Sequence, residues 1–220
     1  MSIRLTRAEY WLLETAVDVD ARIPLCFLNP RYYKVHSSME VMFNKADHGQ
    51  SYHELVSTLD EMFHDGLIVA ERDGARTHLS RAQIEQALDE ENPRSNPDCT
   101  DFCVTPHGGR VWEQFAQPQW DRLIAEEFDN DEPTCVVTGM TEWRVEQYVR
   151  YLGMLSYEID SQSIRKRSIG AWQAKSWKQL PYGHCIKFRW ISELNDHVDE
   201  LHQLAFGAQC DVRDRWYGWR

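Results

Sequence analysis

Apolar and polar residues alternate along the N-terminal half in a way that predicts several helices, each with a marked start. Thr6, Ser51 and Ser80 are each followed three residues later by Glu or Gln, which is the spacing of a capping box. The clearest helix starts at Ser51, because apolar residues recur there every three or four positions, and Gly66 follows as its C-terminal stop. Its apolar face consists of Tyr52, Leu55, Val56, Leu59, Met62 and Phe63.

Shorter elements complete this half of the chain. Apolar runs of strand length, bounded by turn residues, predict strands over 67–70 and 101–104, with a turn over 71–74 after the first. Further helices are expected over 39–46 and 80–88. Thr105 followed by Pro106 predicts another helix start, because proline suits the first helical position.

Beyond residue 133 the pattern is that of a small mixed domain. It predicts strands over 134–138, 164–177 and 185–191, and helices over 142–156 and 192–206. The last two strands are expected to pair antiparallel through a turn at 181–183. The order strand, helix, strand, strand, helix favours a small α/β sandwich of the ferredoxin-like kind.

The charge distribution supports a division into two domains. The chain of 220 residues has 24 basic and 35 acidic residues and a net charge of -11. Residues 135–220 carry 12 basic and 10 acidic residues, whereas residues 1–134 carry 12 and 25. The acidic segment 126–133 ends in proline where this balance changes. It is therefore predicted to link a domain of residues 1–125 to a domain of residues 134–220.

The first 120 residues resemble a winged-helix domain in the order of their elements and in two local patterns. Residues 65–68 (Asp-Gly-Leu-Ile) resemble the step from a helix into the first wing strand. Residues 104–109 (Val-Thr-Pro-His-Gly-Gly) resemble the returning wing strand and the helix that follows it. Residues 74–99 depart from the family pattern as an insertion in the wing. The expected fold is α+β, with a winged-helix-like domain followed by the small sandwich.

Several classes of function find no support in the sequence. No stretch approaches the ~20 apolar residues of a membrane span, and the N-terminus lacks a signal peptide, so a cytoplasmic protein without membrane contact is expected. Cys99 and Cys103 lie on a predicted strand about 13 Å apart, too far for one zinc ion. No phosphate loop, dinucleotide-binding glycine motif, nucleophile elbow or zinc-protease motif occurs. We therefore expect no catalytic residues, metal or cofactor.

The helix over 51–63 takes the place of the recognition helix in the resemblance, yet it carries no basic residue. Its acids Glu54, Asp60 and Glu61 would repel phosphate. One hypothesis is therefore a non-enzymatic module that docks a basic protein through this acidic face. Bacterial immunity proteins and other inhibitors of basic toxins are of this general kind. Trp216 and Trp219 are candidate anchors for that partner, unless they dock on their own chain.

The alternative hypothesis is a nucleic-acid-binding, transcriptional regulator. Residues 161–192 contain no acid, and their basic residues alternate with aromatic ones, the pattern of a surface that binds phosphates and stacks bases. The candidate contacts, with two arginines of the wing, are Arg72, Arg76, Arg165, Lys166, Arg167, Trp172, Lys175 and Lys178. The same stretch would equally suit a domain contact, a protein contact or a solvated sheet face.

Overall fold

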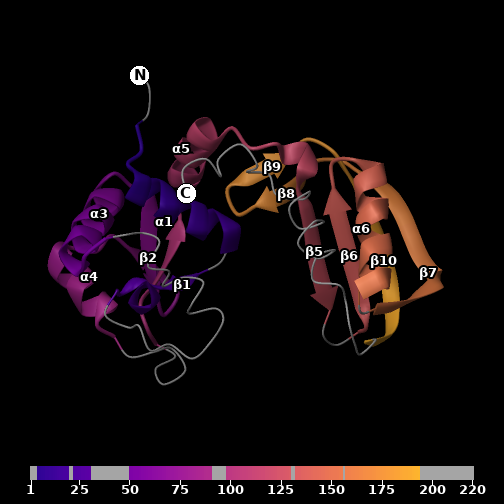
Figure 1. The fold of residues 1–220 in the computed structure, drawn as a ribbon, viewed down its shortest axis with the longest axis horizontal. Coiled ribbons are helices and arrows are strands. Elements are labelled where there is room, and N and C mark those ends of the chain that lie inside the picture. Colours follow the sequence, from indigo (N-terminus) through magenta and orange to yellow (C-terminus); the bar gives the residue numbers. More distant parts are fainter. Residues whose placement is uncertain are drawn as a thin grey trace. The chain divides into compact units, whose positions relative to one another are not determined.

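The computed structural model describes residues 4–19, 22–30, 50–90, 98–129, 132–155 and 157–193 (Figure 1). The protein is α+β and consists of two compact units. One comprises Met1–Phe115 with Lys175–Trp177, and the other comprises Ala116–Ala174 with Lys178–Arg220. The first boundary therefore falls ten residues before the predicted one at 125. The helix expected over 39–46 and the candidate anchors Trp216 and Trp219 lie outside the described residues.

The first unit contains helices and an antiparallel sheet whose described strands have the order β1-β4-β2-β3. In chain order its elements are α1 (Arg7–Val19), β1 (Ile23–Pro24), η1 (Leu25–Leu28), α3 (Tyr52–His64), β2 (Ile68–Arg72), β3 (Ala75–Thr77), α4 (Arg81–Leu88), β4 (Asp101–Val104) and α5 (Pro106–Ala116). Its core includes Leu12, Leu55, Phe63, Phe102 and Trp112, all of which are almost completely buried.

Local capping interactions confirm the predicted helix ends. The Ser51 hydroxyl and the Glu54 carboxylate form a reciprocal capping box at the start of α3. Gly66 follows this helix with φ 66°, a left-handed conformation that favours glycine. Thr105 joins two elements, because its hydroxyl donates to the Gly66 carbonyl at 2.6 Å and accepts the N–H of Gly108 at 2.9 Å. The start of α5 is thus held against the start of β2.

The segment predicted as a wing contains a hairpin where the sequence predicted only a turn. Strand β2 continues through Glu71 and Arg72, and the chain reverses at Asp73 and Gly74, which have φ 50° and 77°. An Asp-Gly pair with two positive φ angles is typical of a tight β-hairpin. The short β3 then pairs with β2 before the predicted helix, observed as α4, begins.

The second unit is a sheet with strand order β5-β6-β10-β7 and one described α-helix, α6, packed on it. Its elements are η3 (Trp120–Arg122), β5 (Ile124–Asp129), β6 (Thr134–Gly139), α6 (Glu142–Leu155), β7 (Tyr157–Ile169), β8 (Trp172–Lys175), β9 (Lys178–Leu180) and β10 (Gly183–Glu193). Strand β10 pairs antiparallel with both β6 and β7, so β6 and β7 run parallel on either side of it. Strands β8 and β9 form a separate two-stranded sheet.

The predicted linker over 126–133 is wrong for its first four residues, which belong to β5. This strand pairs with β6 from Ile124 to Asp129. An edge strand tolerates charged side chains because one of its sides faces water, and its acidic composition therefore resembled that of a linker.

The strand predictions near the C-terminus need two corrections. The segment 164–177 is not one strand, because β7 ends at Ile169 and β8 begins at Trp172. The turn at 181–183 connects β9 to β10, whereas β10 takes β7 as its antiparallel partner. Strand β10 also continues to Glu193, into the start of the helix expected over 192–206, and the rest of that helix lies outside the described residues.

Candidate functional site

The two faces of the second unit's sheet have different chemistry. One face packs against α6 and forms an apolar core of Cys135, Val137, Val145, Val149, Leu152, Ile186 and Phe188. Side chains alternate between the faces along a strand, and directly paired residues of neighbouring strands share a face. Because Ile186 and Phe188 point into the core, Cys185, Lys187 and Arg189 lie on the opposite face.

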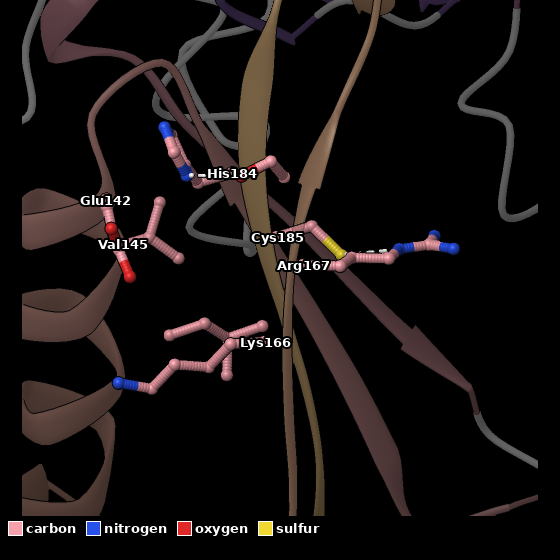
Figure 2. Close-up of a pocket in the computed structure, with 8 residues that line it drawn as sticks. Glu142, Val145, Lys166, Arg167, His184 and Cys185 are labelled. Carbon is pink, nitrogen blue, oxygen red and sulfur yellow. Dashed lines mark hydrogen bonds between the residues drawn. The ribbon is translucent and has the colours of Figure 1, made fainter.

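Four exposed cations gather on this opposite face. The register pairs Arg165 of β7 with Lys187 of β10, and Arg167 with Cys185. Figure 2 shows Arg167 and Cys185 directed away from α6, while Lys166 and His184 point toward it. We call Arg165, Arg167, Lys187 and Arg189 the basic sheet face. Two residues along a strand span about 7 Å, and the four cations lie at three successive positions of this spacing along β7 and β10.

None of the four cations forms an ion pair with a carboxylate of another described residue. Arg165 donates from Nη1 to the carbonyls of Gln162 at 2.8 Å and Ile164 at 3.0 Å. Arg167 donates from Nε to the Cys185 Sγ at 3.3 Å. Within the described part of the chain, the side chains of Lys187 and Arg189 form no hydrogen bond or ion pair.

The acid nearest to Arg189 in the sheet register is Asp160. The Asp160 carboxylate accepts the N–H of Gln162 at 3.0 Å and makes no described ion pair with Arg189. Arg165, Arg167 and Lys187 therefore keep their charge available to an anion in solution, whereas Asp160 lowers the net charge next to Arg189.

Lys166 does not belong to this face, although the sequence analysis grouped it with its two neighbours. It lies beside α6 and forms an ion pair with Glu146. The hydrogen bond from Lys166 and its positive charge lower the pKa of the Glu146 carboxyl. Alternation along β7 separates Lys166 from Arg165 and Arg167, so three adjacent basic residues contribute only two cations to one surface.

Most aromatic residues of this stretch are not available for base stacking. Phe188 is buried, and Trp190 packs partly against the same core. Gly183 lies on the same side of β10 as Cys185 and Lys187, at one end of the basic sheet face. A Cβ added at Gly183 would lie 2.6 Å from the indole nitrogen of Trp172, so Trp172 lies at that end. That nitrogen donates to the Tyr182 carbonyl at 3.0 Å, and the indole is half-buried.

The two remaining lysines of the predicted set lie elsewhere. Lys178 is placed over the Trp120 ring, with 5.3 Å between its Nζ and the ring centre. Lys175 is the last residue of β8 and is grouped with Ser176 and Trp177 in the first unit. The structure therefore brings together Arg165, Arg167 and Trp172 from the predicted nucleic-acid set, without Lys175 and Lys178.

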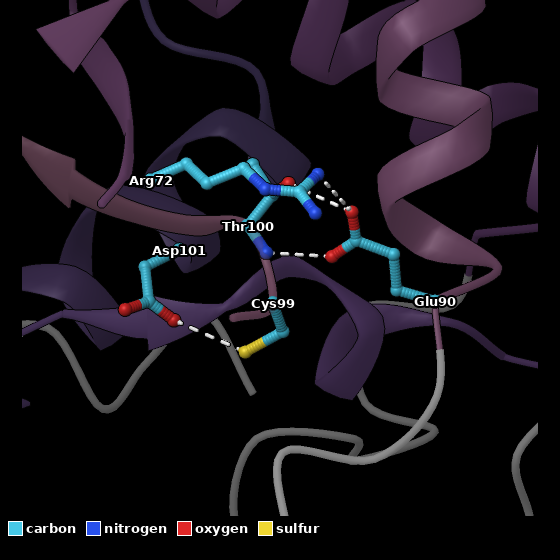
Figure 3. A network of polar contacts seen from close by, with 5 residues as sticks. All are labelled: Arg72, Glu90, Cys99, Thr100 and Asp101. Atoms are coloured by element: carbon cyan, nitrogen blue, oxygen red, sulfur yellow. Dashed lines mark hydrogen bonds and ion pairs between the residues drawn. The ribbon is translucent and has the colours of Figure 1, made fainter. Parts of the chain in front are cut away.

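The two arginines of the predicted wing, Arg72 and Arg76, form ion pairs within the first unit. Arg72 donates to Glu90 at 3.2 Å, and Glu90 also accepts the Thr100 N–H at 2.6 Å (Figure 3). Arg76 pairs at 3.3 Å with Glu71, whose side chain is only 6% exposed. Both arginines thus have carboxylate partners within the first unit, so they are poorly placed to bind phosphate.

The acidic side chains predicted on α3 have different surroundings. Glu54 is exposed and accepts the Ser51 N–H and hydroxyl, which lower the pKa of its carboxyl. Glu61 is exposed and Asp60 is half-buried. Neither Asp60 nor Glu61 forms a side-chain ion pair or hydrogen bond with another described residue.

A small pocket of about 160 Å³ lies between α6 and strands β7 and β10. It contains Ser168, whose hydroxyl lies 3.5 Å from Nδ1 of His184. An activated serine needs a base that is itself oriented by a third group. His184 has no such partner among the residues that the structure describes. This pocket therefore supports no catalytic assignment.

The described residues contain no cluster of three or more His, Cys, Asp or Glu side chains able to hold a metal ion. Within the same parts of the chain, no helix combines the length and apolarity needed to cross a membrane. Cys99 is buried before β4, and its thiol donates to Asp101 at 3.7 Å. No protein-family model, curated protein or solved structure matches this chain.

Lys187 and Arg189 belong to the acid-free stretch of the sequence but were not among its predicted contacts. The signal was present as strict alternation along β10, where Ile186, Phe188 and Trp190 are apolar and the residues between them are basic. Their grouping with Arg165 and Arg167 depends on the β7–β10 register, which joins residues about twenty positions apart.

Proposed function

We propose that the protein binds nucleic acid through the basic sheet face of its second unit. The observation that carries this proposal is the presence of four exposed cations on adjacent strands without a described carboxylate partner. Phosphates favour such a surface, because arginine and lysine replace the counterions that surround the polyanion. The sheet holds the cations at regular intervals, as a repeating polyanion requires.

The mode of binding follows from the other side chains on this face. Base recognition requires donors and acceptors that reach base edges, or aromatic rings on which bases stack. The aromatic residues of β10, Phe188 and Trp190, face the core. The proposed contacts are therefore mainly to phosphate, and affinity depends little on base sequence.

Lys166 provides a matched control for the test, because it lies between Arg165 and Arg167 in sequence but on the α6 face. Binding of a labelled oligonucleotide of about 16 nucleotides is measured by fluorescence anisotropy. Contacts to as many as four phosphates give a slope of about -3 in log affinity against log salt for a single strand. Replacing all four cations by Gln should abolish binding, whereas Lys166→Gln should change affinity less than about twofold.

Two results would refute the proposal. One is the absence of binding by the native protein at about 50 mM salt. The other is equal affinity of the native protein and the variant lacking all four cations. Circular dichroism of each variant confirms that the sheet is intact.

The proposed folds of the two units agree with nucleic-acid binding by the second unit. We propose that the first unit is winged-helix-like, supported by α3 directly before β2 and by the strand order β1-β4-β2. Its recognition-helix position would then carry the acids of α3, which disfavour DNA. The second unit is proposed to be ferredoxin-like, supported by the split unit of β6, α6 and β7 with β10 between the strands.

A second candidate function is docking of a basic protein by α3. It is favoured by Asp60 and Glu61, which lie on one helix without described cationic partners. Charge complementarity of this kind accelerates association more than it strengthens affinity. Reversing Glu54, Asp60 and Glu61 to Lys should slow association with a captured basic partner and weaken its salt dependence. Unchanged association kinetics would exclude this surface.

A further inference from the structure

The basic sheet face is bounded on one side by carboxylates. The register places Glu127 of β5, Val136 of β6, Lys187 of β10 and Arg165 of β7 in one row across the sheet. The next row contains Asp129 of β5, Thr134 of β6, Arg189 of β10 and Asp160 of β7. Both Glu127 and Asp129 are exposed. This face of the sheet is therefore positive at Arg165, Lys187 and Arg189 and negative on β5, and Asp160 of β7 is a further carboxylate beside Arg189.

The strip of positive charge along β7 and β10 is narrow. Neighbouring strands are about 5 Å apart, so Glu127 lies about 10 Å from Lys187, with only β6 between them. The β6 residues in these rows, Val136 and Thr134, are uncharged and give a phosphate no charged partner. One row of phosphates fits along β7 and β10, and a second row to the β5 side meets the carboxylates.

Single strands and duplexes differ in the number of phosphate rows that they present to the sheet. A single strand presents one row of phosphates. A duplex that turns a groove toward the sheet presents two rows, about 6 Å apart across the minor groove or about 12 Å across the major groove. With one row on the cations, the second row of the wider groove would lie above Glu127 and Asp129. A phosphate within about one Debye length of a carboxylate is still repelled by it.

We infer that Glu127 and Asp129 are specificity-determining residues that make the protein prefer single-stranded nucleic acid over duplex. This inference rests on the proposed function and adds the strand state of the ligand. The cations provide the affinity for phosphate, and the acidic edge rejects the second backbone. The carboxylates act by repulsion, so their loss should improve duplex binding instead of weakening it.

The chain offers a matched control in Glu126, which precedes Glu127 on β5 but lies on the α6 face, where it accepts a hydrogen bond from Tyr148. The double variant Glu127→Gln with Asp129→Asn removes two charges from β5, beside the basic sheet face. Glu126→Gln with Glu142→Gln removes two charges from the α6 side of the unit. Any effect of total charge should therefore be equal in the two double variants.

The experiment measures affinities for one sequence as a single strand and as a duplex, at the same salt concentration. We expect the native protein to bind the single strand at least about tenfold more tightly. The Glu127/Asp129 variant should strengthen duplex binding about tenfold and single-strand binding less than about threefold. The Glu126/Glu142 variant should leave the ratio of the two affinities unchanged.

The outcomes separate this inference from the proposed function. If the native protein binds both forms equally, or if both double variants change the ratio alike, the specificity role is refuted while nucleic-acid binding stands. If the native protein binds neither form at low salt, the proposed function fails and the specificity role fails with it. Selective gain of duplex binding by the Glu127/Asp129 variant supports both.

Discussion

Gly108 provides the sharpest stability prediction, because it lies where α5 passes the backbone of Leu67, directly before β2. A Cβ at this position would lie 1.9 Å from the Leu67 carbonyl oxygen and 2.7 Å from its carbon. The obstacle is main chain, and it is held in place because the Leu67 oxygen accepts the Thr105 N–H at 3.0 Å. Gly108→Ala therefore forces α5 and β2 apart or breaks the Thr105 contacts.

Two opposing effects determine the magnitude for Gly108→Ala. Alanine is favoured over glycine in a helix by about 1 kcal/mol. Overpacking a buried position costs about 1–3 kcal/mol, and rupture of the Thr105 hydrogen bonds adds about 1 kcal/mol. The steric effect dominates, so we expect a net loss of about 1–3 kcal/mol in the free energy of unfolding.

Gly153 in α6 gives the matched control, because its added Cβ would meet only the Ile159 Cδ1 at an ordinary 3.5 Å. Gly153→Ala should stabilise the second unit by up to about 1 kcal/mol. Urea unfolding followed by circular dichroism measures both variants, with an unchanged m-value confirming that the midpoints are comparable. A Gly108→Ala protein as stable as the native one would refute the close approach of α5 to Leu67.

Three further predictions concern single residues of the structure. Ser51→Ala should lower the free energy of unfolding by about 1 kcal/mol at neutral pH. The folded-state pKa of Glu54 lies below its usual 4.5, so the stability that its ionised form contributes is lost as the pH falls through that lowered pKa. Urea unfolding at several pH values should therefore show the stabilities of the native protein and the Ser51→Ala variant converging in acid. Burial raises the pKa of Cys26 and of Cys135 to about 12. Mass spectrometry should therefore find both thiols unlabelled by an aromatic disulfide reagent in the native protein at neutral pH, and labelled in urea. Rapid labelling of the native protein would contradict their burial. Glu90→Gln should cost about 1–3 kcal/mol by weakening its hydrogen bonds to the start of β4, and an unchanged urea midpoint would count against that network.

Elements with local signals were predictable from the sequence. The capping box at Ser51, the left-handed Gly66 and the proline at the start of α5 each depend on residues only a few positions apart. Such interactions form in the same way wherever the segment lies. The edge strand β5 could not be recognised, because its acidic residues match an exposed linker and only pairing with β6 makes them a strand.

The sequence alone determined the α+β composition, the helix ends and the uneven distribution of charge. The tertiary structure decided which charges act together. Arg72 and Arg76 are paired with buried carboxylates from neighbouring segments, whereas Arg165 meets Lys187 through the β7–β10 register. A basic residue is available to a ligand only if the fold leaves it exposed and unneutralised. That property depends on residues distant in sequence, which local patterns do not encode.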